Sequence, residues 1–472
     1  MKLRSVFCGL ALAACLAAAP AGAEIADSVN VKTTEFDLPN GLHVILSEDH
    51  TLPRVAVNVL YKVGSGDESK GRTGFAHLFE HLMFCGSAHV GKGEFDSSLE
   101  KVGGSSNAFT MEDYTDYYIT VPPEALPLAL FLESDRMGFF LDNLRPGIVD
   151  EQRDVVKNEV RQRVVNEPYG EKEFALPRLL YPEGHPYSWP VCGSMEDLSA
   201  AEYADVVSFF QQHYTPGSAS LAIVGDFDTA EARKLVEHWF SDVPKGQVSP
   251  RAGQIAVSAQ LDGVVRKTLT DKRIDHPYRE IVWHSPAQYR EGDAACEVLA
   301  GILAKNGSIY SRLGKRLCYD RKIADSVWAL QESRRLSSLF TVGFTALPGH
   351  PDSDLDKIQT IVDGEIARIS REPPQQREID MVVNGLEREY YERLRRINNV
   401  AAQLNFYYCG VGEADYFNRD LERYRRVTPQ EISECAKSWL RPDRRVELTI
   451  LPDPEAAKQT GSAGSGGKEA KP

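Results

Sequence analysis

The feature that most constrains the fold is an internal repeat, in which a helical segment, a turn and a strand recur about 226–229 residues apart. Residues 427–431 (VTPQE), a helical segment, 439–442 (WLRP) and an apolar strand at 446–450 correspond to residues 198–202 (LSAAE), a helical segment, 214–216 (YTP) and a strand at 220–224. A repeat of this length indicates duplication of a whole α+β unit, because solenoid repeats are much shorter. We therefore expect an α+β fold with two homologous, α/β-sandwich-like halves.

Amino-acid composition along the chain predicts further segments at the two ends and between the halves. Residues 1–23 have the charged start, apolar run and Ala-Gly-Ala ending of a secretory signal peptide, so a periplasmic or secreted protein is expected. Residues 12–15 (LAAC) also match a lipobox, which makes a lipoprotein anchored at Cys15 the alternative. The other expected segments are a first half at 24–245, a linker at 246–262, a second half at 263–452 and a disordered tail at 453–472.

The charge balance and the cysteines exclude several classes of protein. A net charge of −14 argues against a nucleic-acid partner. After residue 23 there is no apolar run long enough for a transmembrane segment. The remaining cysteines contain no C-x-x-C pair and so form no zinc ribbon. One or two disulfides are possible in an oxidising compartment, and buried free thiols are favoured. These cysteines are Cys85, Cys192, Cys296, Cys318, Cys409 and Cys435.

Residues 73–86 (TGFAHLFEHLMFCG) carry the chemistry. Read as a helix, the segment has a broad apolar side, and His77, Glu80 and His81 cluster on the opposite side. Two histidines one turn apart can present two nitrogens to one Zn²⁺. The glutamate beside them has the position of a general base for a metal-activated water, and the order H-x-x-E-H is the inverse of the commoner H-E-x-x-H.

Local patterns predict the surrounding elements. Residues 35–46 read as a hairpin around Asn40-Gly41, and residues 54–63, 105–110 and 117–121 read as strands. Helices are expected at 95–102, 125–140, 146–166 and, as one continuous helix, 196–213. Glu159 lies on the helix at 146–166, away from its apolar stripe. It is a candidate third ligand, because a catalytic zinc takes three protein ligands.

Together these segments resemble the pitrilysin-like (inverzincin) zinc peptidases, which include insulin-degrading enzyme and mitochondrial processing peptidase. The resemblance covers about residues 32–452 and is carried by residues 73–86, 103–110 (GGSSNAFT), 115–121 (TDYYITV), 152–159 (QRDVVKNE) and 194–198 (SMEDL).

The resemblance implies a zinc-dependent endopeptidase that hydrolyses extended or unfolded peptides, with its two halves facing each other across a chamber. It implies that one Zn²⁺ is bound by His77, His81 and Glu159 and that Glu80 is the general base. It also implies that a substrate strand pairs with Asn107, Ala108 and Phe109. The alternative is a non-catalytic scaffold or interaction subunit that keeps the fold.

The sequence departs from the family pattern in two respects. The glutamate that many relatives have seven residues before the third ligand is Gln152 here, with Glu151 beside it. An arginine and a tyrosine that contact substrate align with Cys318 and Asp325, which cannot make the same contacts.

A slip in this alignment would bring Arg316, Tyr319 and Arg321 into consideration. We therefore predict a heterodimer with a related zinc-less subunit that supplies the arginine and tyrosine, or otherwise a homodimer.

Overall fold

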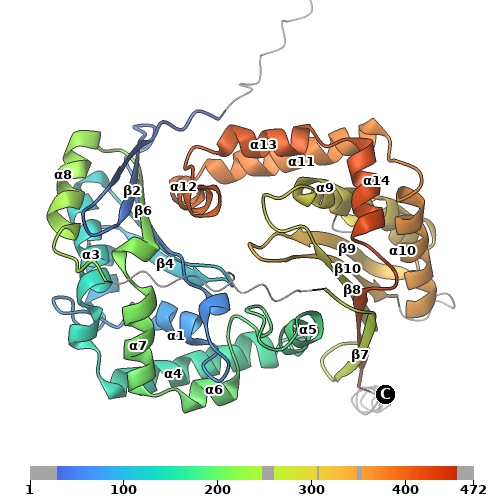
Figure 1. Cartoon of the computed structure of the whole chain (residues 1–472), viewed down its shortest axis with the longest axis horizontal. Coiled ribbons are helices and arrows are strands. Elements are labelled where there is room, and N and C mark those ends of the chain that lie inside the picture. Colours follow the sequence, from blue (N-terminus) through green and yellow to red (C-terminus); the bar gives the residue numbers. More distant parts are fainter. Residues whose placement is uncertain (1–28, 247–259, 306–307, 348–352, 454–472) are drawn as a thin grey trace, which may run out of the picture.

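The computed structural model describes residues 29–246, 260–305, 308–347 and 353–453. The predicted signal peptide, Cys15, most of the predicted linker and all but the first residue of the predicted tail lie outside these ranges. Within them the chain forms two halves, each with one sheet and several helices (Figure 1).

The first half contains a six-stranded sheet and eight α-helices among the described residues. Its strands are β1 (Thr34–Asp37), β2 (His43–Glu48), β3 (Val55–Tyr61), β4 (Ser105–Thr110), β5 (Thr115–Val121) and β6 (Ala219–Gly225). Its helices are α1 (Phe75–Leu82), α2 (Glu94–Lys101), α3 (Leu126–Asn143), α4 (Pro146–Val160), α5 (Lys172–Leu180), α6 (Met195–Ala200), α7 (Tyr203–His213) and α8 (Thr229–Phe240).

The second half contains a five-stranded sheet and six α-helices among the described residues. Its strands are β7 (Val264–Asp271), β8 (Tyr278–Ser285), β9 (Ala324–Glu332), β10 (Ser338–Ala346) and β11 (Arg445–Pro452). Its helices are α9 (Asp293–Ala304), α10 (Leu355–Ile369), α11 (Gln376–Leu394), α12 (Ile397–Val411), α13 (Phe417–Arg425) and α14 (Pro429–Ser438).

The two sheets have the same topology. The first runs β1-β2-β6-β3-β5-β4, and the second runs β7-β11-β8-β10-β9. The pairs β2–β6 and β7–β11 are parallel, and the pairs that follow them in each order are antiparallel. The second sheet therefore repeats the first without β1, which confirms the predicted α+β fold with duplicated halves.

The predicted helix at 196–213 is wrong in one respect, because the structure divides it into α6 and α7. Ala201 leaves the helical conformation with ψ of 124°. Glu202 then starts α7, and the side chain of Asp205 accepts a hydrogen bond from the Glu202 backbone N–H at 3.0 Å. A capping box of this kind begins a new helix, although the residues on either side keep helical spacing.

Each half places one helix on the sheet of the other half. Alternate residues of β2, β3 and β6 face opposite sides, and Ile45, Ala56 and Ala222 pack with Leu404 of α12 in a buried cluster. In return, Leu176 of α5 packs against the second sheet. This exchange holds the halves together, because each sheet would otherwise leave an apolar face in water.

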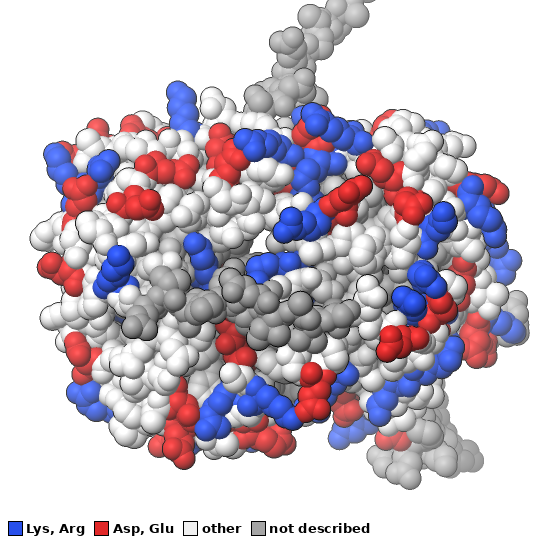
Figure 2. Space-filling model, viewed as in Figure 1, with Lys and Arg blue, Asp and Glu red and all other residues white. Residues whose placement is uncertain are grey.

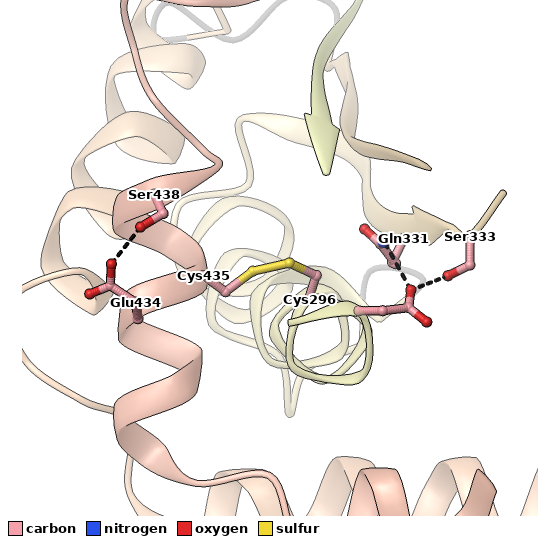
Figure 3. Close-up of a disulfide and its surroundings, with 7 residues drawn as sticks. Cys296, Gln331, Ser333, Glu434, Cys435 and Ser438 are labelled. Carbon is pink, nitrogen blue, oxygen red and sulfur yellow. Dashed lines mark hydrogen bonds between the residues drawn. A yellow bond between two sulfur atoms is a disulfide. The ribbon is translucent and has the colours of Figure 1, made fainter. Parts of the chain in front are cut away.

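A disulfide joins two helices of the second half. Cys296 of α9 is bonded to Cys435 of α14 in the interior (Figure 3). Cys85, Cys192, Cys318 and Cys409 are not disulfide-bonded. The preference for free thiols is therefore wrong for one pair, because scattered spacing in the sequence carries no information on which helices become neighbours.

On the face of the molecule shown in Figure 2, acidic and basic side chains are interspersed. None of the helices within the described ranges combines the length and the apolar character that a membrane span requires.

Candidate metal centre and active site

The position of helix α1 is fixed at its N-terminus. Gly74 precedes it in the left-handed region with φ of 88°, and a Cβ there would lie 2.7 Å from the carbonyl oxygen of Cys192. The buried carboxylate of Glu68 accepts hydrogen bonds from the backbone N–H groups of Gly74 and Ala76 at 2.9 and 2.8 Å. A carboxylate at a helix N-terminus satisfies unpaired donors and interacts favourably with the helix dipole.

The structure brings together the three predicted ligands. His77 and His81 lie on one side of α1, and Glu159 lies in the last turn of α4. Glu159 Oε2 lies 3.0 Å from His81 Nε2 and 4.0 Å from His77 Nε2. One potential ligand atom from each residue lies within 4.8 Å of the other two.

The two histidines of the cluster are in the protonation state that metal binding requires. Burial, together with the neighbouring His81, lowers the pKa of His77 to about 4, and burial also lowers the pKa of His81. Both imidazoles are therefore neutral at pH 7, as metal ligation requires. Two nitrogens and one carboxylate oxygen match the donor set of a catalytic zinc, with a fourth position left open.

Two features of the cluster add to what the sequence predicts. Arg163 Nη1 lies 2.6 Å from the other oxygen of Glu159, Oε1, and so orients this carboxylate toward the histidines. Its spacing of four residues from Glu159 on a helix is a signal that the sequence contains. His77 Nδ1 is buried and has no hydrogen-bond partner among the described residues. The ring of His77 is therefore held by packing rather than by an acceptor beside it.

Glu80 lies next to the cluster and is oriented by β4. Its Oε2 accepts a hydrogen bond of 2.7 Å from the hydroxyl of Thr110, the last residue of β4. Burial raises the pKa of Glu80, and the Thr110 hydroxyl opposes this change. A raised pKa brings a carboxyl group closer to the range in which it can both accept and return a proton near neutral pH.

A cleft of about 660 Å³ extends from this cluster to the second sheet. Its walls come from both halves, and β4 is the edge strand of the first sheet. Ala108 and Phe109 line the cleft beside His77 and Glu80. Asn107 lies on the same strand, and its side chain accepts a hydrogen bond from the Ala108 N–H at 2.9 Å.

The positions that depart from the family pattern are not among the residues that line this cleft. Gln152 is not among the residues that line it, and Glu151 forms an ion pair with Lys92 at 2.7 Å. Cys318 and Asp325 do not line it either.

A slip in the alignment of Cys318 and Asp325 would bring other residues into consideration, and these have partners or exposure of their own. Arg316 lies 3.5 Å from Glu365, and Tyr319 is exposed. Neither of these residues lines the cleft.

Comparison with known proteins supports the resemblance. Residues 43–177 match the family described as Insulinase (Peptidase family M16), and residues 200–386 match the Peptidase M16 inactive domain. The first match contains the cluster and Glu80. The two matches do not follow the two halves, because β6 lies in the second match and pairs with β2 and β3 of the first sheet.

Individual relatives extend over most of the chain. It is 26% identical over 379 residues to the zinc protease PqqE of Helicobacter pylori, covering 80% of this chain and 83% of PqqE. A crystal structure of a protease from Helicobacter pylori has a TM-score of 0.82 at 23% identity, covering 89% of this chain and all of that one.

The periplasmic protease PqqL from Escherichia coli has a TM-score of 0.74 at 16% identity, and the match covers 94% of this chain and 51% of PqqL. The two family matches together span most of the described chain, and the fold agrees with both structures. The chain therefore belongs to the M16 family of peptidases.

Proposed function

We propose that this chain is a zinc endopeptidase that cleaves extended peptides. The observation that carries the proposal is the cluster of His77, His81 and Glu159 beside a cleft that Glu80 and an open strand edge line. The three ligands would hold one Zn²⁺. When bound, Zn²⁺ lowers the pKa of a coordinated water and polarises a carbonyl group.

The residues of the chain would then perform the remaining steps. An extended peptide pairs with the free edge of β4 through backbone hydrogen bonds, which leaves selection by side chains loose. Glu80 takes the proton of the attacking water, with its carboxylate held by Thr110. The same group returns this proton to the amine that leaves.

The proposed partner is a related chain without a zinc cluster. This chain spans only about half of PqqL, so PqqL has room for a second unit of similar size. Neither Cys318 nor Asp325 lines the cleft, and neither side chain could replace an arginine or a tyrosine. We propose that a heterodimer completes the site. A monomer with full peptidase activity would contradict this part of the proposal.

We also propose a periplasmic location. PqqL is described as a periplasmic protease, and residues 1–23 of this chain have the pattern of a signal peptide. The mass of the mature N-terminus would distinguish cleavage after residue 23 from lipidation at Cys15.

The test uses a quenched, unstructured peptide mixture and this chain together with the related subunit, with and without chelator and with zinc restored. We expect cleavage that the chelator abolishes, and we expect Glu80→Gln to keep zinc while lowering kcat by a factor on the order of 10²–10⁴. Glu151→Gln is the matched control, because Glu151 is an exposed glutamate of α4 paired with Lys92 outside the cleft.

The possible failures differ. A protein that binds no zinc would refute the metal assignment. A protein that binds one zinc but does not cleave on its own would favour either a missing partner or the alternative of a non-catalytic scaffold. Addition of the related subunit separates these two, because only an incomplete enzyme would then gain activity.

A further inference from the structure

The turn between β4 and β5, residues 111–114, is a point at which the two halves meet. Arg335, in the turn between β9 and β10 of the second half, contacts Asp113 twice. Its Nε lies 3.0 Å from Asp113 Oδ1, and its backbone N–H donates to Asp113 Oδ2 at 3.1 Å. The neighbouring Arg334 lies 3.0 Å from Glu112. Two consecutive arginines of the metal-free half therefore hold two consecutive acids of the first half.

Tyr187 connects the same two turns. Its hydroxyl lies 2.7 and 2.6 Å from the two carboxylate oxygens of Asp113 and accepts a hydrogen bond of 3.2 Å from the Leu336 N–H. Tyr187 is 1% exposed, and Asp113 is buried. Since buried charge-assisted hydrogen bonds are strong and directional, this contact restricts the position of the turn.

The turn is also tied to the chain that leads into α1. The backbone N–H groups of Ser65 and Gly66 donate to the carbonyls of Met111 and Glu112 at 3.1 and 2.8 Å. A Cβ at Gly64 would lie 2.3 Å from the Met111 carbonyl oxygen, so the two backbones can approach this closely only with glycine there. Thr110, which binds Glu80, directly precedes this turn.

We propose that Arg335 is a positioning residue for Glu80, acting through Asp113, the β4–β5 turn and the hydroxyl of Thr110. The inference rests on the proposed function and adds a role for the second half, which would orient the general base as well as line the cleft. The physical reason is that a carboxylate must point at the reacting water, and a displacement of about 1 Å can cost on the order of 100-fold in rate.

The test is a double-mutant cycle between Arg335→Met and Thr110→Val. Methionine keeps much of the apolar stem of arginine but loses the charge and the Nε donor. Valine keeps the shape of threonine but loses the hydroxyl. We expect each single variant to lower kcat by about 10- to 100-fold, with KM within about twofold and zinc content unchanged. Thr110→Ser should retain kcat, because serine keeps the donor.

The coupling is decided by the double variant. If Arg335 acts through Thr110, then Arg335→Met should cause no further loss of kcat in the Thr110→Val background. A double variant whose loss equals the product of the two single losses would overturn the proposal, as would an unchanged kcat in Arg335→Met. Arg312→Met is the matched control, because Arg312 is a largely buried arginine of the second half whose partners Glu365 and Glu378 lie in that half.

Hydrogen exchange gives a readout that does not depend on catalysis. Arg335→Met should speed the exchange of the amides at residues 111–114, and Arg312→Met should not. Unchanged exchange at the turn overturns the proposal even if the protein cleaves no peptide. A wild-type protein that stays inactive after the related subunit is added refutes the proposed function instead, so the two failures are distinguishable.

Discussion

Loss of the disulfide between Cys296 and Cys435 should destabilise the second half strongly. The two cysteines are 139 residues apart, and both are buried between α9 and α14. The chain-entropy account assigns a 139-residue loop about 5 kcal/mol, and native disulfides contribute about 2–5 kcal/mol in practice. With a slope of about 3 kcal/mol per molar urea, the unfolding midpoint should fall by about 1–2 M.

The assay is urea unfolding of wild type and of Cys296→Ala/Cys435→Ala, each with and without reductant. Reductant should lower the midpoint of wild type to that of the double variant and should leave the double variant unchanged. Cys318→Ala is the control, because Cys318 is not disulfide-bonded. A wild-type midpoint that does not respond to reductant, together with six titratable thiols in the unfolded mature chain, would refute the reasoning.

Two further predictions concern buried charges in the first half. Burial, together with His284, lowers the pKa of His185 to about 4, and its Nδ1 accepts a hydrogen bond of 3.0 Å from the Tyr187 N–H. Since the unfolded chain binds this proton at higher pH, the contribution of His185 to the free energy of unfolding should fall by about 1–2 kcal/mol between pH 6.5 and 4. His185→Asn keeps an acceptor and should show a smaller fall in urea unfolding at the two pH values; an equal fall would contradict the assignment. Arg136 is 1% exposed and pairs with the fully buried Glu133 at 2.5 Å, so Arg136→Met should cost about 3–5 kcal/mol. Glu133→Gln/Arg136→Met should be more stable than the single variant in the same assay, and a double variant that is less stable would show that the stranded charge is not the cause.

Much of the local structure could be predicted from the sequence. The spacing of His77, Glu80 and His81 places them on one side of a helix in any fold, because helical periodicity depends only on backbone geometry. The hairpin around Asn40-Gly41 likewise forms with the pairing of Asp37 and His43 at its end. These features are encoded within about ten residues.

Other contacts could not be predicted, because they depend on how elements pack. Thr110 is a threonine on a predicted strand, and its sequence neighbours do not reveal that its hydroxyl reaches Glu80. The break between α6 and α7 was missed because the apolar spacing continues across Ala201. The exchange of α5 and α12 between the halves has no local signal, since an apolar helix face does not specify which sheet covers it.

The sequence by itself determined the duplicated α+β architecture and the side of α1 that carries the histidines, because both follow from periodicity and repetition along the chain. Only the tertiary structure brought Glu159 to within 3.0 Å of His81 and joined the turn that follows Thr110 to Arg335 of the other half. The reason is physical. Helical periodicity and an internal duplication can both be read along the chain, whereas the distance between side chains far apart in the sequence is set by the packing of the helices and sheets that carry them.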